Sequence, residues 1–274
     1  MTDTFTLYKI EHAIELGTTL TDNWFRGHPQ AYNELSPGIF RKKYEILRTL
    51  RPDLEFFIIE NFKREAHAYI SHPPDYNDHT SWLFLMQHHG APTRLLDWTR
   101  NVLIALYFAV RNHEDEDGEL WSMRPDNLNK HNGLFGKPTP INPVLAFLAS
   151  EPSHNNPEEL ARQLDLPSIP KYPFAVLPPT KFQRLVNQSA AFTIHPTPFS
   201  GGTIPDILTD RKDLVRYIIP KKNKLKLRLA LEALGIMEHT LFPDLDSLSK
   251  SIIFRAHHSF AYGPPEPPQW KNEE

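Results

Sequence analysis

Prolines divide this chain more strongly than any other feature of its sequence, because a proline cannot continue the interior of a helix or a central strand. The chain has 26 prolines among 274 residues. They cluster at Pro73–Pro74, from Pro138 to Pro179, at Pro196–Pro198 and from Pro264 to Pro268. Regular structure should therefore form between these clusters. We expect a single domain over 1–262 with a proline-rich insertion near 125–172, followed by an extended or disordered tail over 263–274.

Apolar spacing predicts helices in the first half of the chain. From Leu54 to Ile70, apolar side chains recur every three or four residues, which is the period of one helical face. Ser81–His88 is a second predicted helix. Thr93–Arg111 is a third, and because it is apolar on most sides we expect it in the core. Two more helices are predicted later: Lys221–Leu234, with a basic face, and one within Leu241–Phe254 that has Asp244 or Asp246 near its start.

Strand-like segments are concentrated in the second half of the chain. Alternating and β-branched residues predict strands at Asn23–Gly27, Leu120–Met123, Phe174–Leu177, Ala191–His195 and Leu214–Ile219. The last of these stops at Pro220, which has no amide hydrogen for a sheet. We therefore predict an α+β fold, in which a helix-rich N-terminal half packs on a mainly antiparallel sheet contributed largely by the C-terminal half.

The bulk composition narrows the classes of function. Hydrophobic residues make up 40% of the chain and charged residues 23%, an ordinary balance for a folded domain. The net charge is −3, so a contact with nucleic acid is expected only in a local groove. The absence of cysteine removes disulfides, thiolate catalysis and cysteine-ligated zinc. No signal peptide is apparent in Met1–Ile10, and the longest apolar run, near Val102–Val110, is too short for a bilayer, so we expect a cytoplasmic protein without a membrane partner.

Phe25–Arg26–Gly27 is the first candidate for a functional segment. An arginine at a strand end can present a planar fork of donors to a phosphate or a carboxylate. A glycine beside it would let a ligand approach the backbone closely. The alternative, which the tripeptide alone favours, is an arginine in a surface ion pair.

The segment Gln87–Asn101 is the second candidate and is dense in polar groups. If a helix begins just after the break at Gly90, the first backbone amides of that helix would be free to bind an anion. Thr93 is placed to cap that helix, and Asp97 lies three residues after Arg94. A functional site and a purely structural Arg94–Asp97 pair, tying helix to sheet, explain this pattern equally well.

Histidines and lysines elsewhere suggest no stronger site. The chain has 14 histidines, but neighbours such as His88–His89 and His257–His258 cannot usually reach one ion, so no metal is expected. Glu114–Asp117 precedes a glycine and is interpreted as a solvated turn. The basic run Lys221–Arg228 is interpreted mainly as a solvated helix face, with a groove for RNA phosphates as the alternative.

These segments resemble the FRG domain family, which is named for the Phe–Arg–Gly signature that stands here as Phe25–Arg26–Gly27. The most specific block is "WLFLMQHHGAPTRLLDWTRNVLIALYFAV", residues 82–110. Further similar segments are "LSPGIFR" (35–41), the Leu54–Ile70 helix, "QSAAFTIHP" (188–196) and "LFPDLDSL" (241–248). The resemblance implies one FRG-type domain over 1–262, and family members resemble components of bacterial toxin–antitoxin and phage-defence loci.

The aromatic–Arg–Gly opening is also similar to that of arginine-type ADP-ribosyltransferases, in which the arginine holds the phosphates of NAD. This similarity implies an ADP-ribosyltransferase-like fold with NAD as a substrate. Those enzymes continue with a serine–threonine strand, for which Ser189–Thr193 stands in here. They also carry a glutamate on a later loop, for which Glu238 is a weak match; Asp97 or a histidine is the alternative.

The leading hypothesis is therefore a toxin-like ADP-ribosyltransferase that modifies RNA or single-stranded DNA, with an antitoxin protein as an expected partner. The residues it assigns to catalysis are Arg26, Thr93, Arg94 and Asp97. The residues it assigns to NAD binding are Phe25, Arg26, Gly27, Gln87, His88, Gly90 and Thr193. A protein acceptor stays open, although Lys221–Arg228 favours nucleic acid.

Two other classes of function also stay open. In the first, the same segments bind a nucleotide or nucleic acid without turnover, as a sensor. In the second, His88, His89 and Asp97 serve a metal-dependent nuclease, which lacks the clustered carboxylates that such an enzyme usually has.

Overall fold

The computed structural model describes residues 3–32, 34–133, 171–178, 183–196 and 202–261. The predicted tail over 263–274 lies outside these residues, as does most of the predicted insertion near 125–172. The first residues of that insertion form a short helix, α6 (Pro125–Lys130). Within the described ranges, the helices are all too short or too polar to cross a membrane.

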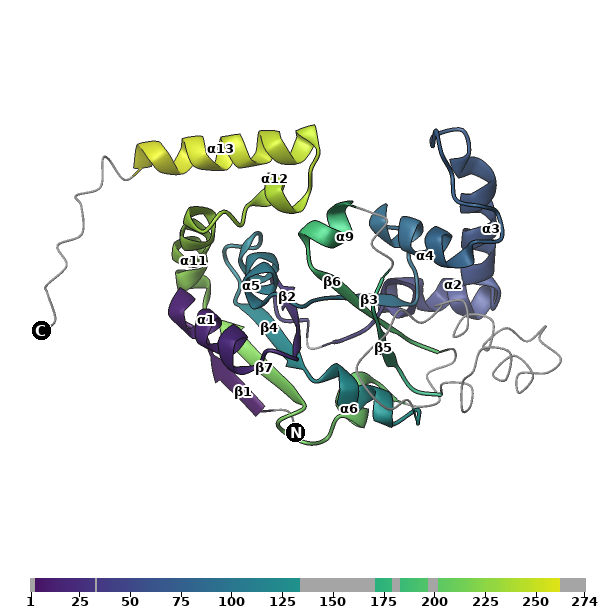
Figure 1. Ribbon diagram of the computed structural model, residues 1–274, viewed down its shortest axis with the longest axis horizontal. Helices are drawn as coiled ribbons and strands as arrows, with labels where there is room; N and C mark the ends of the chain where they lie inside the picture. Colours follow the sequence, from purple (N-terminus) through teal and green to yellow (C-terminus); the bar gives the residue numbers. More distant parts are fainter. Residues whose placement is uncertain (1–2, 33, 134–170, 179–182, 197–201, 262–274) are drawn as a thin grey trace, which may run out of the picture.

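A seven-stranded mixed sheet forms the centre of the described structure (Figure 1). Its strand order is β1-β7-β4-β2-β3-β6-β5, and each neighbouring pair is antiparallel except β1 with β7. The strands are β1 (Asp3–Thr6), β2 (Trp24–His28), β3 (Leu95–Thr99), β4 (Gly118–Met123), β5 (Phe174–Val176), β6 (Ala190–Ile194) and β7 (Leu214–Ile219). The α+β class and the mainly antiparallel pairing are confirmed. Because β1 to β4 all precede Arg124, the prediction that the C-terminal half contributes most of the sheet is wrong.

Helices cover this sheet and extend beyond it (Figure 1). They are α1 (Ile10–Thr19), α2 (Glu45–Leu50), α3 (Leu54–Ala66), α4 (His79–His88), α5 (Val102–Val110), α6, α9 (Gln183–Asn187), α10 (Ile204–Ile207), α11 (Lys221–Ala233), α12 (Glu238–Leu241) and α13 (Leu245–Ala261), with 3-10 turns η1 (Gly38–Phe40) and η2 (Lys42–Tyr44). The predictions of α3, α4 and α11 are confirmed to within a few residues. Asp244 caps α13 as expected, since its Oδ1 accepts a hydrogen bond from Ser247 N at 2.7 Å.

The predicted helix Thr93–Arg111 is wrong in its first half, because Leu95–Thr99 is strand β3 and the helix begins only at Val102. Asn101 marks the boundary: its Oδ1 accepts a hydrogen bond from Leu103 N at 2.9 Å and caps α5. The segment Leu95–Thr99 reads LLDWT, which is too short to show whether its apolar residues follow the period of a strand or of a helix, and this explains the error.

Helix α5 is the centre of the largest core cluster, together with side chains of β2, β4, α11 and α12. Its residues Ala105, Leu106, Tyr107 and Ala109 are fully buried, as expected for a helix that is apolar on most sides. The helix lies unusually close to β2 because Gly27 has no side chain. A Cβ on Gly27 would come within 1.8 Å of Ala105 O. Gly27 therefore serves the packing of α5 on the sheet.

The sheet opens between its two central strands. Strand β2 pairs with β4 over five residues, and β3 pairs with β6 over five, but β2 and β3 share only the pair Phe25–Thr99. Side chains alternate between the faces of a strand, so Arg26 and His28 lie on the face opposite to Gly27 and α5. Arg26 therefore points toward the opening at the point where β2 and β3 separate.

Candidate functional site

A pocket of about 500 Å³ lies where β2 and β3 separate. Five arginines and lysines line it, namely Arg26, Arg41, Lys43, Arg111 and Arg184, whereas Asp97 is the one carboxylate in the described lining. Tyr32, Tyr44, Trp98 and Phe108 contribute aromatic surface. A volume in this range with a strong excess of cations suits a small anionic ligand that carries a flat ring.

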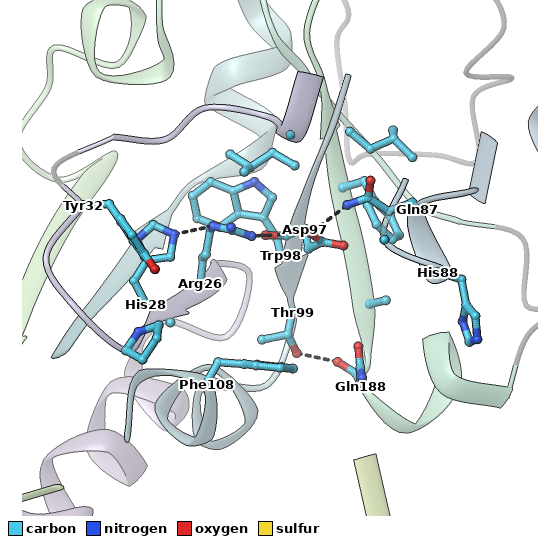
Figure 2. Close-up of a pocket in the computed structure, with 18 of the residues that line it drawn as sticks. Arg26, His28, Tyr32, Gln87, His88, Asp97, Trp98, Thr99, Phe108 and Gln188 are labelled. Atoms are coloured by element: carbon cyan, nitrogen blue, oxygen red, sulfur yellow. Dashed lines mark hydrogen bonds and ion pairs between the residues drawn. The ribbon is translucent and has the colours of Figure 1, made fainter. Parts of the chain in front are cut away.

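Arg26 and Asp97 meet across the opening (Figure 2). Arg26 Nη1 donates to Asp97 O at 2.5 Å and lies 3.7 Å from Asp97 Oδ2. The Arg26 side chain is only 12% exposed, whereas that of Asp97 is 55% exposed and reaches into the pocket. Burial lowers the pKa of Arg26 to about 10, against the opposing charge of Asp97, so the guanidinium stays protonated at neutral pH.

A buried polar chain holds Arg26 from behind. Arg26 Nε donates to His28 Nε2 at 2.7 Å, so His28 carries its hydrogen on Nδ1 and donates it to Glu119 Oε1, also at 2.7 Å. Arg216 completes the chain with bonds of 2.7 and 2.8 Å to Glu119 Oε2. Burial and the charge of Arg26 lower the pKa of His28 to about 4. A neutral imidazole thus positions a charged guanidinium.

We expect the free energy of unfolding to fall as the pH drops from about 6.5 toward 4. Burial also lowers the pKa of His195 to about 3, so both His28 and His195 stay neutral in the fold while the unfolded chain takes up their protons. Each contributes a slope of about 1.4 kcal/mol per pH unit in this window. Urea unfolding at a series of pH values should show a shallower slope for His28→Gln than for the unsubstituted protein. An equal slope would contradict the neutral state of His28.

A second polar chain orients the Asp97 carboxylate. Thr93 Oγ1 donates to Gln87 Oε1 at 2.5 Å, and Gln87 Nε2 donates to Asp97 Oδ2 at 2.8 Å. Thr93 is fully buried and lies outside the pocket lining, so it acts on Asp97 only through Gln87. The structure thus brings together Arg26, Gln87 and Asp97 from two segments that lie far apart in the sequence.

Arg94 does not join this group. It forms a buried ion pair with Glu55 of α3, with Nε 3.0 Å from both carboxylate oxygens and Nη2 2.6 Å from Oε2. Arg94 precedes β3 and Asp97 lies within it, so the structural Arg94–Asp97 pair, one of the two alternatives that the sequence left open, is replaced by the pair with Glu55. Arg94 ties α3 to the start of β3.

Arg94→Met is expected to lower the free energy of unfolding by about 3 kcal/mol, because it leaves Glu55 buried without its partner. The double variant Arg94→Met/Glu55→Gln should recover part of this loss. Urea unfolding monitored by tryptophan fluorescence measures both. Unchanged stability with loss of ligand binding would instead support the catalytic role that the sequence assigned to Arg94.

Gly90 ends a helix rather than preceding one. It has φ of +77° after α4, where Gly90 N donates to Gln87 O and Ala91 N to Met86 O, each at about 3 Å. This hydrogen-bond pattern is the Schellman motif of a helix C-terminus. Since a strand follows, the expected cradle of helix N-terminal amides is absent from this position.

The remaining predicted residues are divided between the pocket and the core. Phe25, Gly27, Gln87, His88 and Gly90 line the pocket. Thr193 is fully buried outside the lining, where Trp98 Nε1 donates to its Oγ1 at 3.1 Å and His195 Nε2 lies 3.1 Å from it. Glu238 also lies outside the lining and accepts a hydrogen bond from Tyr107 of α5.

The histidine and lysine segments take structural positions. His88 lines the pocket, and its backbone oxygen accepts a hydrogen bond from Arg184 Nη1 at 2.9 Å. Across the described ranges, no group of three or more His, Asp or Glu side chains is arranged to hold a metal ion. In the basic run, Lys224 is buried and donates to Pro29 O, Asn112 O and His113 O at 2.7 Å, so it braces the pocket wall instead of facing solvent.

Sequence reasoning missed much of the charge in this pocket. Arg41 lies within the "LSPGIFR" segment that resembles the FRG family, but neither Arg111 nor Arg184 lies in a motif that pointed to function. They reach the pocket because α5 ends at Val110 and α9 follows β5 on the far side of β3. No local signal in the sequence would have identified them.

Residues 21–118 match the FRG domain family. This match confirms the predicted family resemblance over that segment, which includes both Arg26 and Asp97 but ends before Arg184. No curated protein and no solved structure shows significant similarity to the chain.

Proposed function

We propose that the pocket binds NAD and that the protein transfers ADP-ribose from it to a nucleic acid, RNA or single-stranded DNA. One observation carries the proposal: Arg26 and Asp97 meet 3.7 Å apart at the opening of the sheet, in a pocket rich in cations. NAD combines a pyrophosphate, two sugars and two flat rings. A cation beside an accessible carboxylate, flanked by aromatic side chains, matches those groups.

Arg26 supplies the grip on the pyrophosphate. Its guanidinium is fixed by His28 and by the Asp97 carbonyl, so little side-chain freedom remains to be lost when an anion binds. Tyr32 lies against His28 with ring centroids 5.3 Å apart and is 50% exposed, which leaves aromatic surface for a base. Figure 2 shows Tyr32 and His28 on the same side of the pocket as Arg26.

Asp97 supplies the negative charge that the reaction needs. As the bond from the ribose C1′ to the nicotinamide nitrogen breaks, its electron pair leaves with nicotinamide and positive charge develops on the sugar. A carboxylate held in place by Gln87 stabilises that charge without reorganisation. The acceptor then forms the new bond to C1′ and loses a proton. Asp97 thus takes the part that a loop glutamate plays in the enzymes the sequence resembles.

The biological setting belongs to the same proposal. The FRG resemblance supports a toxin-like role in a bacterial toxin–antitoxin or anti-phage system, acting in the cytoplasm and held in check by an antitoxin partner. Thr93 acts as a positioning residue, because it donates a hydrogen bond to Gln87, which in turn orients Asp97. Gly27 lines the pocket and also lets α5 lie close to β2, whereas Arg94 and Thr193 enter only through the fold.

Incubation of the purified protein with NAD labelled in its adenylate part tests this function. Separate pools of RNA, single-stranded DNA and lysate protein serve as acceptors, and nicotinamide release is followed in parallel. We expect label in a nucleic-acid pool, and its loss in Arg26→Ala. Arg51→Ala, an exposed arginine of the α2–α3 loop, is the matched control.

The outcomes separate the classes of function. Label found only in the protein pool would support the transferase activity but would show that the acceptor is a protein. Neither transfer nor nicotinamide release from a folded protein would overturn the transferase, and NAD binding that persisted would then favour a nucleotide sensor without turnover.

A further inference from the structure

Two arginines meet over one aromatic ring at the pocket wall. Arg184 of α9 lies 4.4 Å from the centroid of the Phe242 ring, and Arg111, the residue after α5, lies 5.5 Å from the same centroid. Phe108 packs edge-on against Phe242 at 6.0 Å and also lies beneath Arg111 at 5.1 Å. Arg111, Arg184 and Phe108 all line the pocket, whereas Phe242, the ring that the two guanidinium groups share, lies behind its lining.

Neither guanidinium is neutralised by a carboxylate of the described chain. Neither Arg111 nor Arg184 has an acidic side chain within 4 Å among the described residues, whereas Arg26, Arg94 and Arg216 each have one. Glu238 and Asp244 attract Arg184 from a longer distance, while Glu238 accepts a hydrogen bond from Tyr107 and Asp244 caps α13.

The surroundings of Arg111 and Arg184 destabilise their two positive charges. Burial lowers the pKa of Arg184, and the charge of Arg111 lowers it further, against the attraction of Asp97, Asp244 and Glu238. Two like charges brought together and partly removed from water destabilise each other unless an anion lies between them. Arg184 is also held in place, since its Nη1 donates to His88 O at 2.9 Å. The pair is therefore a preformed cationic site without an anion from the described residues.

This site is separate from the Arg26 end of the pocket. Arg26 lies on β2, whereas Arg111 follows α5 and Arg184 lies on α9. Figure 2 shows Phe108, which packs beneath Arg111, apart from the group of Arg26, His28 and Tyr32. The effect of Asp97 on the pKa of Arg184 places the carboxylate within electrostatic reach of both ends. One pocket thus contains two cationic regions, and the Asp97 carboxylate lies within electrostatic reach of both.

We propose that Arg111 and Arg184 form a second phosphate site, which holds the backbone of a single-stranded nucleic acid while Arg26 holds the nucleotide substrate. This inference rests on the proposed function. A planar guanidinium binds phosphate oxygens through two parallel hydrogen bonds, and arginine with aromatic surface is a common platform for unpaired strands. A base that reacts inside a pocket must leave its stack, which an unpaired strand does at the least cost.

The experiment compares binding of two probes to the same variants. The probes are a short fluorescein-labelled RNA of mixed sequence, with the matching single-stranded DNA, and NAD. The variants are Arg111→Gln, Arg184→Gln and the double variant, with Arg64→Gln as the matched control, because Arg64 is an exposed arginine of α3 outside the pocket. Arg111→Lys and Arg184→Lys keep the charge and show whether a loss arises from misfolding.

We expect the double variant to bind the oligonucleotide about tenfold more weakly, with a larger loss for the oligonucleotide than for NAD. Each glutamine should also reduce the slope of log affinity against log salt by about 0.7. The lysine variants keep the charge, so they should retain the salt slope and more affinity than the glutamine variants, and Arg64→Gln should change little.

Three results would overturn the proposal. The first is unchanged oligonucleotide affinity in the double variant, and the second is an equal loss for Arg64→Gln, which would indicate nonspecific charge. The third is a loss of NAD affinity as large as the loss of oligonucleotide affinity, which would indicate that Arg111 and Arg184 bind the phosphates of NAD. Oligonucleotide binding through Arg111 and Arg184 without nicotinamide release would instead support the site and count against the transferase.

Discussion

Asp97→Asn is expected to lower the rate of nicotinamide release by about 100- to 1,000-fold while the affinity for NAD changes little. Asparagine keeps the size of the side chain and can still accept a hydrogen bond from Gln87 Nε2. It removes only the negative charge, which is required in the transition state and not in the ground state. The loss should therefore fall on kcat and leave KM nearly unchanged.

Nicotinamide release at saturating NAD, with NAD affinity measured by calorimetry, checks this result. Asp53→Asn is the control, because Asp53 is an exposed acid that precedes α3, outside the pocket lining. Thermal melting of each variant separates chemistry from folding. A variant that is folded, binds NAD and retains full activity would remove Asp97 from the mechanism.

Gly27→Ala is expected to cost about 4 kcal/mol or more of unfolding free energy, the largest stability effect that we predict. The new Cβ would lie 1.8 Å from Ala105 O and 2.7 Å from Ala109 N, both backbone atoms of α5. No rotamer change relieves such a contact, so α5 must move away from β2. Because α5 is the centre of the largest core cluster, that movement disturbs many packed side chains.

Urea unfolding measures the effect, with Gly38→Ala as the control. A Cβ on Gly38 would meet Pro92 Cα at 3.4 Å, an ordinary contact, and we expect a change below about 1 kcal/mol there. Gly118→Ala should resemble Gly27→Ala, since its Cβ would lie 2.4 Å from Ala109 O. Wild-type stability in Gly27→Ala, with weakened ligand binding, would restore the role that the sequence suggested for this glycine.

Local patterns predicted the elements whose signals are local. Alternation and Pro220 placed β7 at its observed bounds, and the spacing of apolar residues placed α3 and α11 closely. Asp244 was identified as a cap because its partner, Ser247, is only three residues away. The resemblance to the FRG family also marked Arg26, Gln87 and Asp97, which do meet in one pocket.

Tertiary structure alone decided which groups became partners. Arg94 pairs with Glu55, 39 residues earlier, rather than with Asp97, three residues later. Lys224 turns inward to carbonyl groups more than 100 residues away. Arg111 and Arg184 share a ring that neither lies near in the sequence.

The physical reason for this difference is how far apart in the sequence the interacting residues lie. The sequence by itself determined backbone periodicity and capping, because these depend on neighbours within one or two turns. It could not determine whether the short segment Leu95–Thr99 forms a strand, since that depends on β6 being present beside it. The pocket exists because β2 and β3 share only one residue pair, and that separation is a property of the assembled sheet.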